Sequence, residues 1–384
     1  MVELVLVPLV VGVVASLVAA WLIARRRQAR RERELAQMQR TALPRQAKPR
    51  QPGLQPKHRY YTEMAGLHIG VTLLVGDSHT TFGPGEIITA CVAGRPATLP
   101  EDWDTVAPKL IERAEEAARE RGAVFFDGQT YSLLDYRLEA VDPVSEYKVL
   151  HLKLGKSTYY HYVTTNLALD LRVLSEDNRL LTPREKYAIY DPHRIRDLPL
   201  SNQLAVNMNV VTSDDCLVVQ RRSDRVGNYL NTVASGVNAS MTRGDQGSPK
   251  DEDDEGRPDP FSTVRREAYE ELGLEDKAIT DIEFHGLGVE LAYFQPLLFG
   301  ELRTEQTSDE LIRRARFEAR DKFEYRELQC IPLEAETIGR HLFADESQWV
   351  AVTALALVFS LLHRHGYEHV ESAFRSLAKA KIIE

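Results

Sequence analysis

An uninterrupted apolar segment near the N-terminus restricts this chain more than any other feature. Residues 4–24 (LVLVPLVVGVVASLVAAWLIA) contain no charged side chain over 21 positions. A helix rising ~1.5 Å per residue would make this segment roughly 31 Å long, which matches the hydrocarbon core of a bilayer. Three arginines follow at 25–27, and short basic flanks stay on the cytoplasmic side of a membrane. The pattern predicts a single-pass membrane anchor over residues 1–27, with the C-terminal body in the cytoplasm.

A cleaved signal peptide and a buried core helix are two other interpretations of this segment. A cleaved signal peptide needs a positively charged start, a short apolar core and a small-residue cleavage site. Here Glu3 is the charge that precedes the apolar run, and arginines stand where cleavage would occur. A buried core helix could have the same composition. The length of the run and its basic stop favour the anchor.

The next 31 residues, 28–58, predict a basic, proline-containing linker. Prolines stand at 44, 49, 52 and 56, and this spacing does not allow a continuous helix. Residues 1–58 together hold 11 Lys/Arg and 3 Asp/Glu. Contact of the arginines with anionic lipid is an alternative to a role in topology alone.

The rest of the chain is acidic and globular in composition. It carries 37 Lys/Arg against 54 Asp/Glu, which argues against nucleic acid as a partner because non-specific nucleic-acid binding requires a positive surface. A phosphorylated small molecule can still bind an acidic protein through a divalent metal. Three cysteines, at 91, 216 and 330, are far apart in the sequence and are expected to be reduced thiols.

The body has the pattern of an α+β fold. A helix is predicted from residue 99 to about 121 and a core helix over 346–365, of which 349–362 is too short to cross a membrane readily. Segments rich in β-branched and aromatic residues predict strands at 67–75, 86–92, 124–126, 131–141, 147–154, 159–165, 204–212 and 216–220. The last two are expected to form a hairpin.

The segment with the clearest chemical signal is the predicted helix that starts near Pro260. Asp259 is expected to cap it and Gly273 to end it. Glu267, Glu270 and Glu271 have i, i+3 and i+4 spacing, so their carboxylates project from one side. A hard divalent cation would offset their mutual repulsion, since Mg²⁺ prefers oxygen ligands. A solvated, charged helix face is the alternative interpretation.

Residues 266–274 (REAYEELGL) contain R-E-x-x-E-E-x-G, a pattern that arises by chance in roughly one chain in several thousand. They resemble the second half of the Nudix box, G-x5-E-x7-R-E-U-x-E-E-x-G-U, with U a bulky aliphatic residue. Arg266, Glu267, Glu270, Glu271 and Gly273 occupy box positions.

The first half of the box departs from the family pattern. Gly236, after two strands and Arg221-Arg222, is the nearest counterpart of the box glycine, but 29 residues separate it from Arg266 where the family has 13. The early glutamate, often a partner of the box arginine in the family, would fall on Thr242. The intervening acidic insert, about 243–258, is expected to be a disordered loop.

The resemblance implies an α/β/α sandwich over residues 201–345, preceded by an α+β region of unknown role at 59–200 and followed by a C-terminal helical segment at 346–384. It also implies an enzyme of the Nudix pyrophosphohydrolase type. Such an enzyme hydrolyses a nucleoside diphosphate linked to another group.

Each box residue receives a role from the resemblance. The three glutamates would be the catalytic residues and would hold Mg²⁺, or Mn²⁺ in its place. Gly236, Arg266 and Gly273 would be structural, and Arg221 and Arg222 would bind substrate phosphate or form surface ion pairs. Glu346 is a candidate general base, although an acid at a helix start also has an ordinary explanation.

Three hypotheses about function follow from these patterns. The first is a membrane-tethered hydrolase that acts on a nucleotide-derived small molecule. The second is a Nudix-like module that binds such a ligand at the membrane without cleaving it, and the third is a scaffold with a relic of the box. The sequence does not identify the substrate or the general base, and residues 59–200 could complete the core, form a separate domain or mediate a homodimer.

Overall fold

The computed structural model describes residues 61–92, 107–120, 127–140, 148–171, 173–174, 180–187, 189–223, 229, 231–244, 250–321, 324–345 and 348–383. The expected anchor at 4–24, the linker at 28–58 and Glu346 lie outside these residues. Among the residues described, no helix is both long enough and apolar enough to cross a bilayer.

The fold is built around a mixed sheet of eight strands in the described part of the chain. Six strands lie in the order β11-β10-β9-β14-β13-β3, while β12 pairs with β9 and β15 pairs with β10. The β9–β14 pair is parallel, and the other pairs are antiparallel. The strands are β3 (Val71–Val75), β9 (Ala205–Val211), β10 (Cys216–Arg222), β11 (Val233–Ser235), β12 (Val237–Ser240), β13 (Ile279–Glu290), β14 (Gln295–Thr304) and β15 (Tyr325–Pro332).

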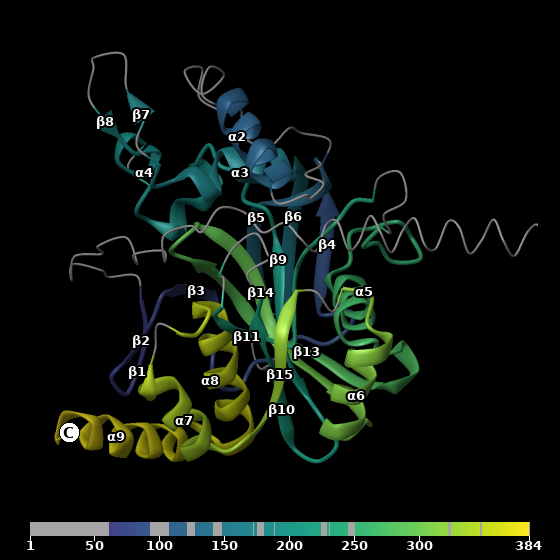
Figure 1. Ribbon diagram of the computed structural model, residues 1–384, viewed down its shortest axis with the longest axis vertical. Helices are drawn as coiled ribbons and strands as arrows, with labels where there is room; N and C mark the ends of the chain where they lie inside the picture. Colours follow the sequence, from purple (N-terminus) through teal and green to yellow (C-terminus); the bar gives the residue numbers. More distant parts are fainter. Residues whose placement is uncertain are drawn as a thin grey trace, which may run out of the picture.

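Helices cover both faces of this sheet (Figure 1). One face packs against α5 and α6 and the other against α7, α8 and α9, and each face has its own hydrophobic cluster. The helices are α5 (Pro260–Leu272), α6 (Ser308–Glu318), α7 (Ala335–Ala344), α8 (Ala351–His365) and α9 (Tyr367–Ile383). The mixed α+β class is therefore confirmed.

The side chains along β9 explain why helices cover this strand on both faces. All seven residues are buried. Val206 and Met208 belong to the cluster that includes α5, whereas Asn209 points the other way and donates to Ser360 Oγ of α8 at 3.0 Å. Strand residues alternate between faces, so an apolar face meets α5 and a hydrogen-bonding face meets α8.

The region 59–200 contributes directly to the same sheet. Its strand β3 pairs with β13, with Val75 opposite Leu287. A second sheet in the order β4-β6-β5 packs into the cluster on the α5 side, and the backbone of β5 bonds to residues 202, 204 and 241. The remaining elements are β1 (Thr62–Met64), β2 (Leu67–Ile69), β4 (Ile87–Cys91), β5 (Gln129–Ala140), β6 (Lys148–Thr158), β7 (Val173–Leu174), β8 (Leu180–Leu181), α2 (Ala107–Glu120), α3 (Tyr159–Thr164) and α4 (Pro183–Lys186).

Two sequence predictions, one about a strand and one about the cysteines, are wrong. Residues 159–165 were expected as a strand, but Tyr159–Thr164 form helix α3, because Thr158 caps it by accepting from the His161 amide at 3.3 Å. The cysteines were expected to be reduced, but Cys216 and Cys330 form a disulfide. They are 114 residues apart in sequence, yet pairing of β10 with β15 places their Cα atoms 5.6 Å apart.

Candidate functional site

The helix that carries the three glutamates begins and ends as its sequence predicts. Asp259 caps α5 by accepting from the amides of Phe261 and Ser262 at 3.0 and 2.9 Å. Pro260 occupies the first turn, where its missing N–H costs no hydrogen bond. Gly273 ends the helix at φ +66°, a left-handed conformation that glycine adopts without a steric cost.

All three carboxylates on α5 lie inside the protein. The Glu267 and Glu270 side chains are 14% and 13% exposed, and Glu271 is 2% exposed. Their burial argues against a solvated helix face. Charged groups in such a position require partners, and the surrounding side chains supply them.

Arg266 is the centre of the charge network. Its Nε and Nη2 donate to the two oxygens of Asp251 at 2.7 and 2.8 Å, a bidentate pair. Its Nη1 donates to Glu267 and, at 3.2 Å, to Glu270 Oε2. One guanidinium therefore orients two of the three glutamates while an aspartate holds it in place.

Asp251 belongs to the insert that was expected to be disordered, and for residues 250–258 that prediction is wrong. Asp251 is fully buried and also accepts from the Thr242 amide at 2.7 Å. The backbone here bridges Glu252 to Pro258. Thr242 stands at the expected glutamate position, and the carboxylate partner of Arg266 is Asp251 instead. The acidic composition of this segment predicts solvated side chains throughout, and it gives no sign that Asp251 is buried.

The third glutamate faces the end of β10. Glu271 Oε2 accepts from Gln220 Nε2 at 3.2 Å. Arg222 is 6% exposed, and its Nε and Nη1 have no hydrogen-bond partner. Its positive charge lowers the pKa of both Glu271 and Glu324, opposing the larger effect of burial. The buried guanidinium of Arg222 therefore has unused donors and acts electrostatically on both Glu271 and Glu324.

Arg221 is not brought to the same place. It is adjacent to Arg222 on β10, and neighbouring strand residues point to opposite faces. Its Nη1 donates to the carbonyl of Asn231 at 3.2 Å. The two arginines predicted to bind substrate therefore have different surroundings, and Arg222 is the one beside the carboxylates.

Two further carboxylates, which sequence reasoning missed, complete the site. Glu324 immediately precedes β15, and Asp321 lies in the connection after α6, where its amide donates to the Glu270 carbonyl at 2.9 Å. Neither residue belongs to a recognisable local motif. Antiparallel pairing of β15 with β10 brings this segment to Arg222, which is opposite Tyr325.

Burial is the largest cause of the raised pKa values in this cluster. It raises the pKa of Glu267 to about 8 and that of Asp321 to about 6, and it raises the pKa of Glu271 well above its ordinary range. Repulsion from neighbouring carboxylates adds to the effect, and Arg266 opposes it at Glu267. Any cation that enters would favour the ionised forms.

The donor set suits a hard cation, but arginine occupies part of the space. Carboxylate oxygens are the ligands that Mg²⁺ prefers. Over the described ranges, no three His, Cys, Asp or Glu side chains are arranged closely enough to hold a metal ion. Since Arg266 Nη1 contacts both Glu267 and Glu270, a metal shared by these glutamates would replace some of the arginine contacts.

Gly236 lies between β11 and β12, where the backbone passes close to its neighbours. A Cβ on this residue would lie 2.7 Å from Val210 Cγ2 and 3.1 Å from the Val218 carbonyl oxygen. We expect Gly236→Ala to lower the free energy of unfolding by about 1–3 kcal/mol because the added methyl group overpacks the site. Urea unfolding measures this change.

Gly83→Ala serves as the matched control for that substitution. A Cβ there would meet Glu86 Oε2 at 3.5 Å, an ordinary contact distance. Equal stability losses in both variants would contradict steric crowding at Gly236.

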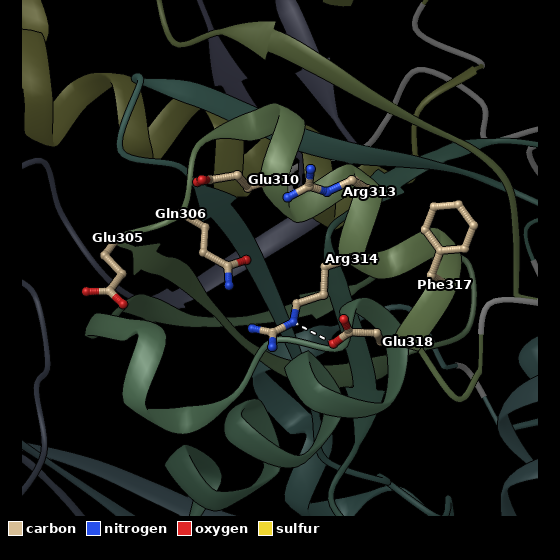
Figure 2. A pocket seen from close by; sticks show the side chains of 7 residues that line it. All are labelled: Glu305, Gln306, Glu310, Arg313, Arg314, Phe317 and Glu318. Carbon is tan, nitrogen blue, oxygen red and sulfur yellow. Dashed lines mark hydrogen bonds and ion pairs between the residues drawn. The ribbon is translucent and has the colours of Figure 1, made fainter.

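A separate pocket of about 570 Å³ lies along α6 (Figure 2). Its lining includes Phe317 and Arg314, and the latter donates to Glu318 at 2.7 Å. None of the site residues predicted from the sequence lines it.

No protein-family profile and no curated protein matches this chain. Among solved structures, it is similar to DR0079 of Deinococcus radiodurans at 17% identity and a TM-score of 0.29, over 50% of this chain and 96% of that one. It is also similar to Tm1382, described as a candidate Nudix hydrolase, at 16% identity and a TM-score of 0.27, over 42% of this chain and 70% of that one. Scores this low do not establish a shared fold or activity.

Proposed function

We propose that the chain is a Nudix-type hydrolase that cleaves a nucleoside diphosphate linked to another group and depends on Mg²⁺, with Mn²⁺ as a substitute. The observation that supports this most is the geometry around α5. Three glutamates at box positions are buried or largely buried, with Glu271 2%, Glu270 13% and Glu267 14% exposed, and Arg266 is paired with Asp251. A helix with a purely structural role gains nothing from burying three like charges.

In this proposal each group at the site has a separate task. Glu267, Glu270 and Glu271 would hold the metal, which would supply positive charge against the substrate phosphates and lower the pKa of a bound water. Arg266 orients Glu267 and Glu270. Glu324 would be the proton acceptor in this proposal, and burial raises its pKa above that of an ordinary glutamate.

The proposal includes the membrane. Residues 4–24 would tether the body to the cytoplasmic face, and the arginines at 25–27 would set this orientation. The substrate would then be a soluble or membrane-linked nucleotide derivative that is reached from the cytoplasm.

The test is an assay of the full chain, purified in mild detergent, against a panel of nucleoside diphosphate derivatives with and without Mg²⁺. We expect metal-dependent turnover that falls at least about 100-fold in a variant carrying Glu270→Gln and Glu271→Gln, because the metal loses two anionic ligands. Glu336→Gln, an exposed helix residue, is the matched control and should leave turnover unchanged.

One observation favours a second candidate function, a ligand-binding module without catalysis. Both oxygens of Glu270 already contact arginines, namely Arg266 and Arg320. Absence of turnover over the whole panel, together with Mg²⁺-dependent stabilisation by one of its compounds, would support this function instead.

A further inference from the structure

The two arginines that contact Glu270 are held very differently. Arg266 donates to Glu270 Oε2 at 3.2 Å, and its side chain is 13% exposed and clamped by Asp251. Arg320 Nη1 donates to Glu270 Oε1 at 2.5 Å, but its side chain is 58% exposed. Arg266 is part of the protein interior, whereas Arg320 approaches the site from its solvent side.

The backbone around Arg320 is anchored independently of its side chain. The amide of the next residue, Asp321, donates to the Glu270 carbonyl at 2.9 Å, and the Asp321 backbone carbonyl accepts from the Glu324 amide at 2.9 Å. The guanidinium could therefore turn away from Glu270 while the connection between α6 and β15 stays in place.

We propose that Arg320 is a resident counter-ion of Glu270 that a divalent metal displaces, and that the released guanidinium then binds the diphosphate of the substrate. This inference rests on the proposed function. A divalent cation supplies the positive charge that Arg320 provides to Glu270 in its absence. The guanidinium then lacks a partner at the mouth of the site, and its planar donors match phosphate oxygens.

The other arginines at the site are less suited to this role. Arg222 is 6% exposed and lies among Glu271 and Glu324. Arg221 donates to a backbone carbonyl. Arg320 combines an exposed guanidinium with direct contact to a proposed metal ligand.

The inference predicts opposite changes in two binding constants for Arg320→Gln. The Kd for Mn²⁺, measured on the full chain by electron paramagnetic resonance of free Mn²⁺, should fall about three- to tenfold because the competing cation is gone. The Kd for inorganic pyrophosphate at saturating Mn²⁺, measured by calorimetry, should rise about tenfold because a charged hydrogen-bond donor is lost.

Arg313→Gln is the control for the change in net charge, since Arg313 is exposed on α6 and lines the pocket of Figure 2 instead. It should move neither constant by more than about twofold. If the wild type binds Mn²⁺ and Arg320→Gln binds it no more tightly, or if pyrophosphate affinity is unchanged, the inference is wrong while the proposed function stands. If neither protein binds Mn²⁺, both are wrong. Binding in the variant alone would show that Mn²⁺ does not displace Arg320 in the natural chain, which would also contradict the inference.

Discussion

Asp251→Asn is expected to lower the free energy of unfolding by about 3–5 kcal/mol, because it leaves Arg266 buried without its bidentate partner. The wild-type carboxylate accepts three hydrogen bonds, two from Arg266 and one from the Thr242 amide. An asparagine amide has one acceptor oxygen, and its NH₂ group would face guanidinium donors. Chemical denaturation of the two proteins at the same pH measures the difference.

Asp254→Asn tests whether this loss is specific. Asp254 lies in the same acidic segment, is exposed and should tolerate the change with little effect. A similar loss in both variants, or a loss below about 1 kcal/mol for Asp251→Asn, would show that the buried pair does not stabilise the fold as proposed. Asp251→Asn should also weaken Mn²⁺ binding, since Arg266 would no longer hold Glu267 and Glu270 in one orientation.

Glu290→Gln, in contrast to Asp251→Asn, is expected to raise the free energy of unfolding at alkaline pH. Glu290 ends β13, is 3% exposed, and burial raises its pKa from 4.5 to about 8. The nearby cation, Arg184, is engaged with Asp170 at 2.7 Å and with the Ala292 carbonyl at 2.6 Å. Ionised Glu290 is therefore poorly compensated.

The sign of the pH dependence follows from linkage. Between pH 4.5 and about 8 the unfolded glutamate loses its proton while the folded one keeps it, so the unfolded state is favoured as pH rises. Glutamine does not titrate. The two proteins should be about equally stable near pH 5, and Glu290→Gln should be more stable by roughly 2–4 kcal/mol at pH 8.5.

Urea unfolding at both pH values checks this expectation, with Glu336→Gln as the control that should follow the wild type at each pH. Other buried carboxylates, including Glu267 and Glu271, change the stability of both proteins in the same way, so the difference isolates Glu290. A stability difference that is independent of pH would mean that Glu290 is ionised or hydrogen-bonded in the fold over this range.

Local sequence was sufficient to predict helix α5 in detail. Asp259 caps it, Gly273 ends it, and the spacing of Glu267, Glu270 and Glu271 places them on one side. Capping, left-handed glycine and helical spacing each depend on a few neighbouring residues. The β9–β10 hairpin was predicted for the same reason, and strands 205–211 and 216–222 are paired as antiparallel neighbours.

Contacts between distant segments could not be obtained in this way. Asp251 lies within the acidic insert, Arg320 and Glu324 lie in the connection between α6 and β15, and none of them has a local pattern that marks its partner. The pairing of β10 with β15 and the return of the chain at 250–258 bring them to α5. Residue 159 shows a different limit, because the Tyr-rich segment after Thr158 favours a strand by residue type, whereas the local cap from Thr158 begins helix α3 there.

The proposed chemistry was therefore inferred from nine consecutive residues, whereas the charge balance around them could not be inferred from that segment. Helix geometry acts over one or two turns, so REAYEELGL alone places three carboxylates together. Whether those carboxylates are solvated, bound to arginine or able to bind a metal depends on burial and on distant side chains as well as on Arg266, since Gln220 and Arg320 are 51 and 50 positions from the glutamates that they contact. Burial and long-range charge pairing arise when the sheet assembles and the helices pack onto it.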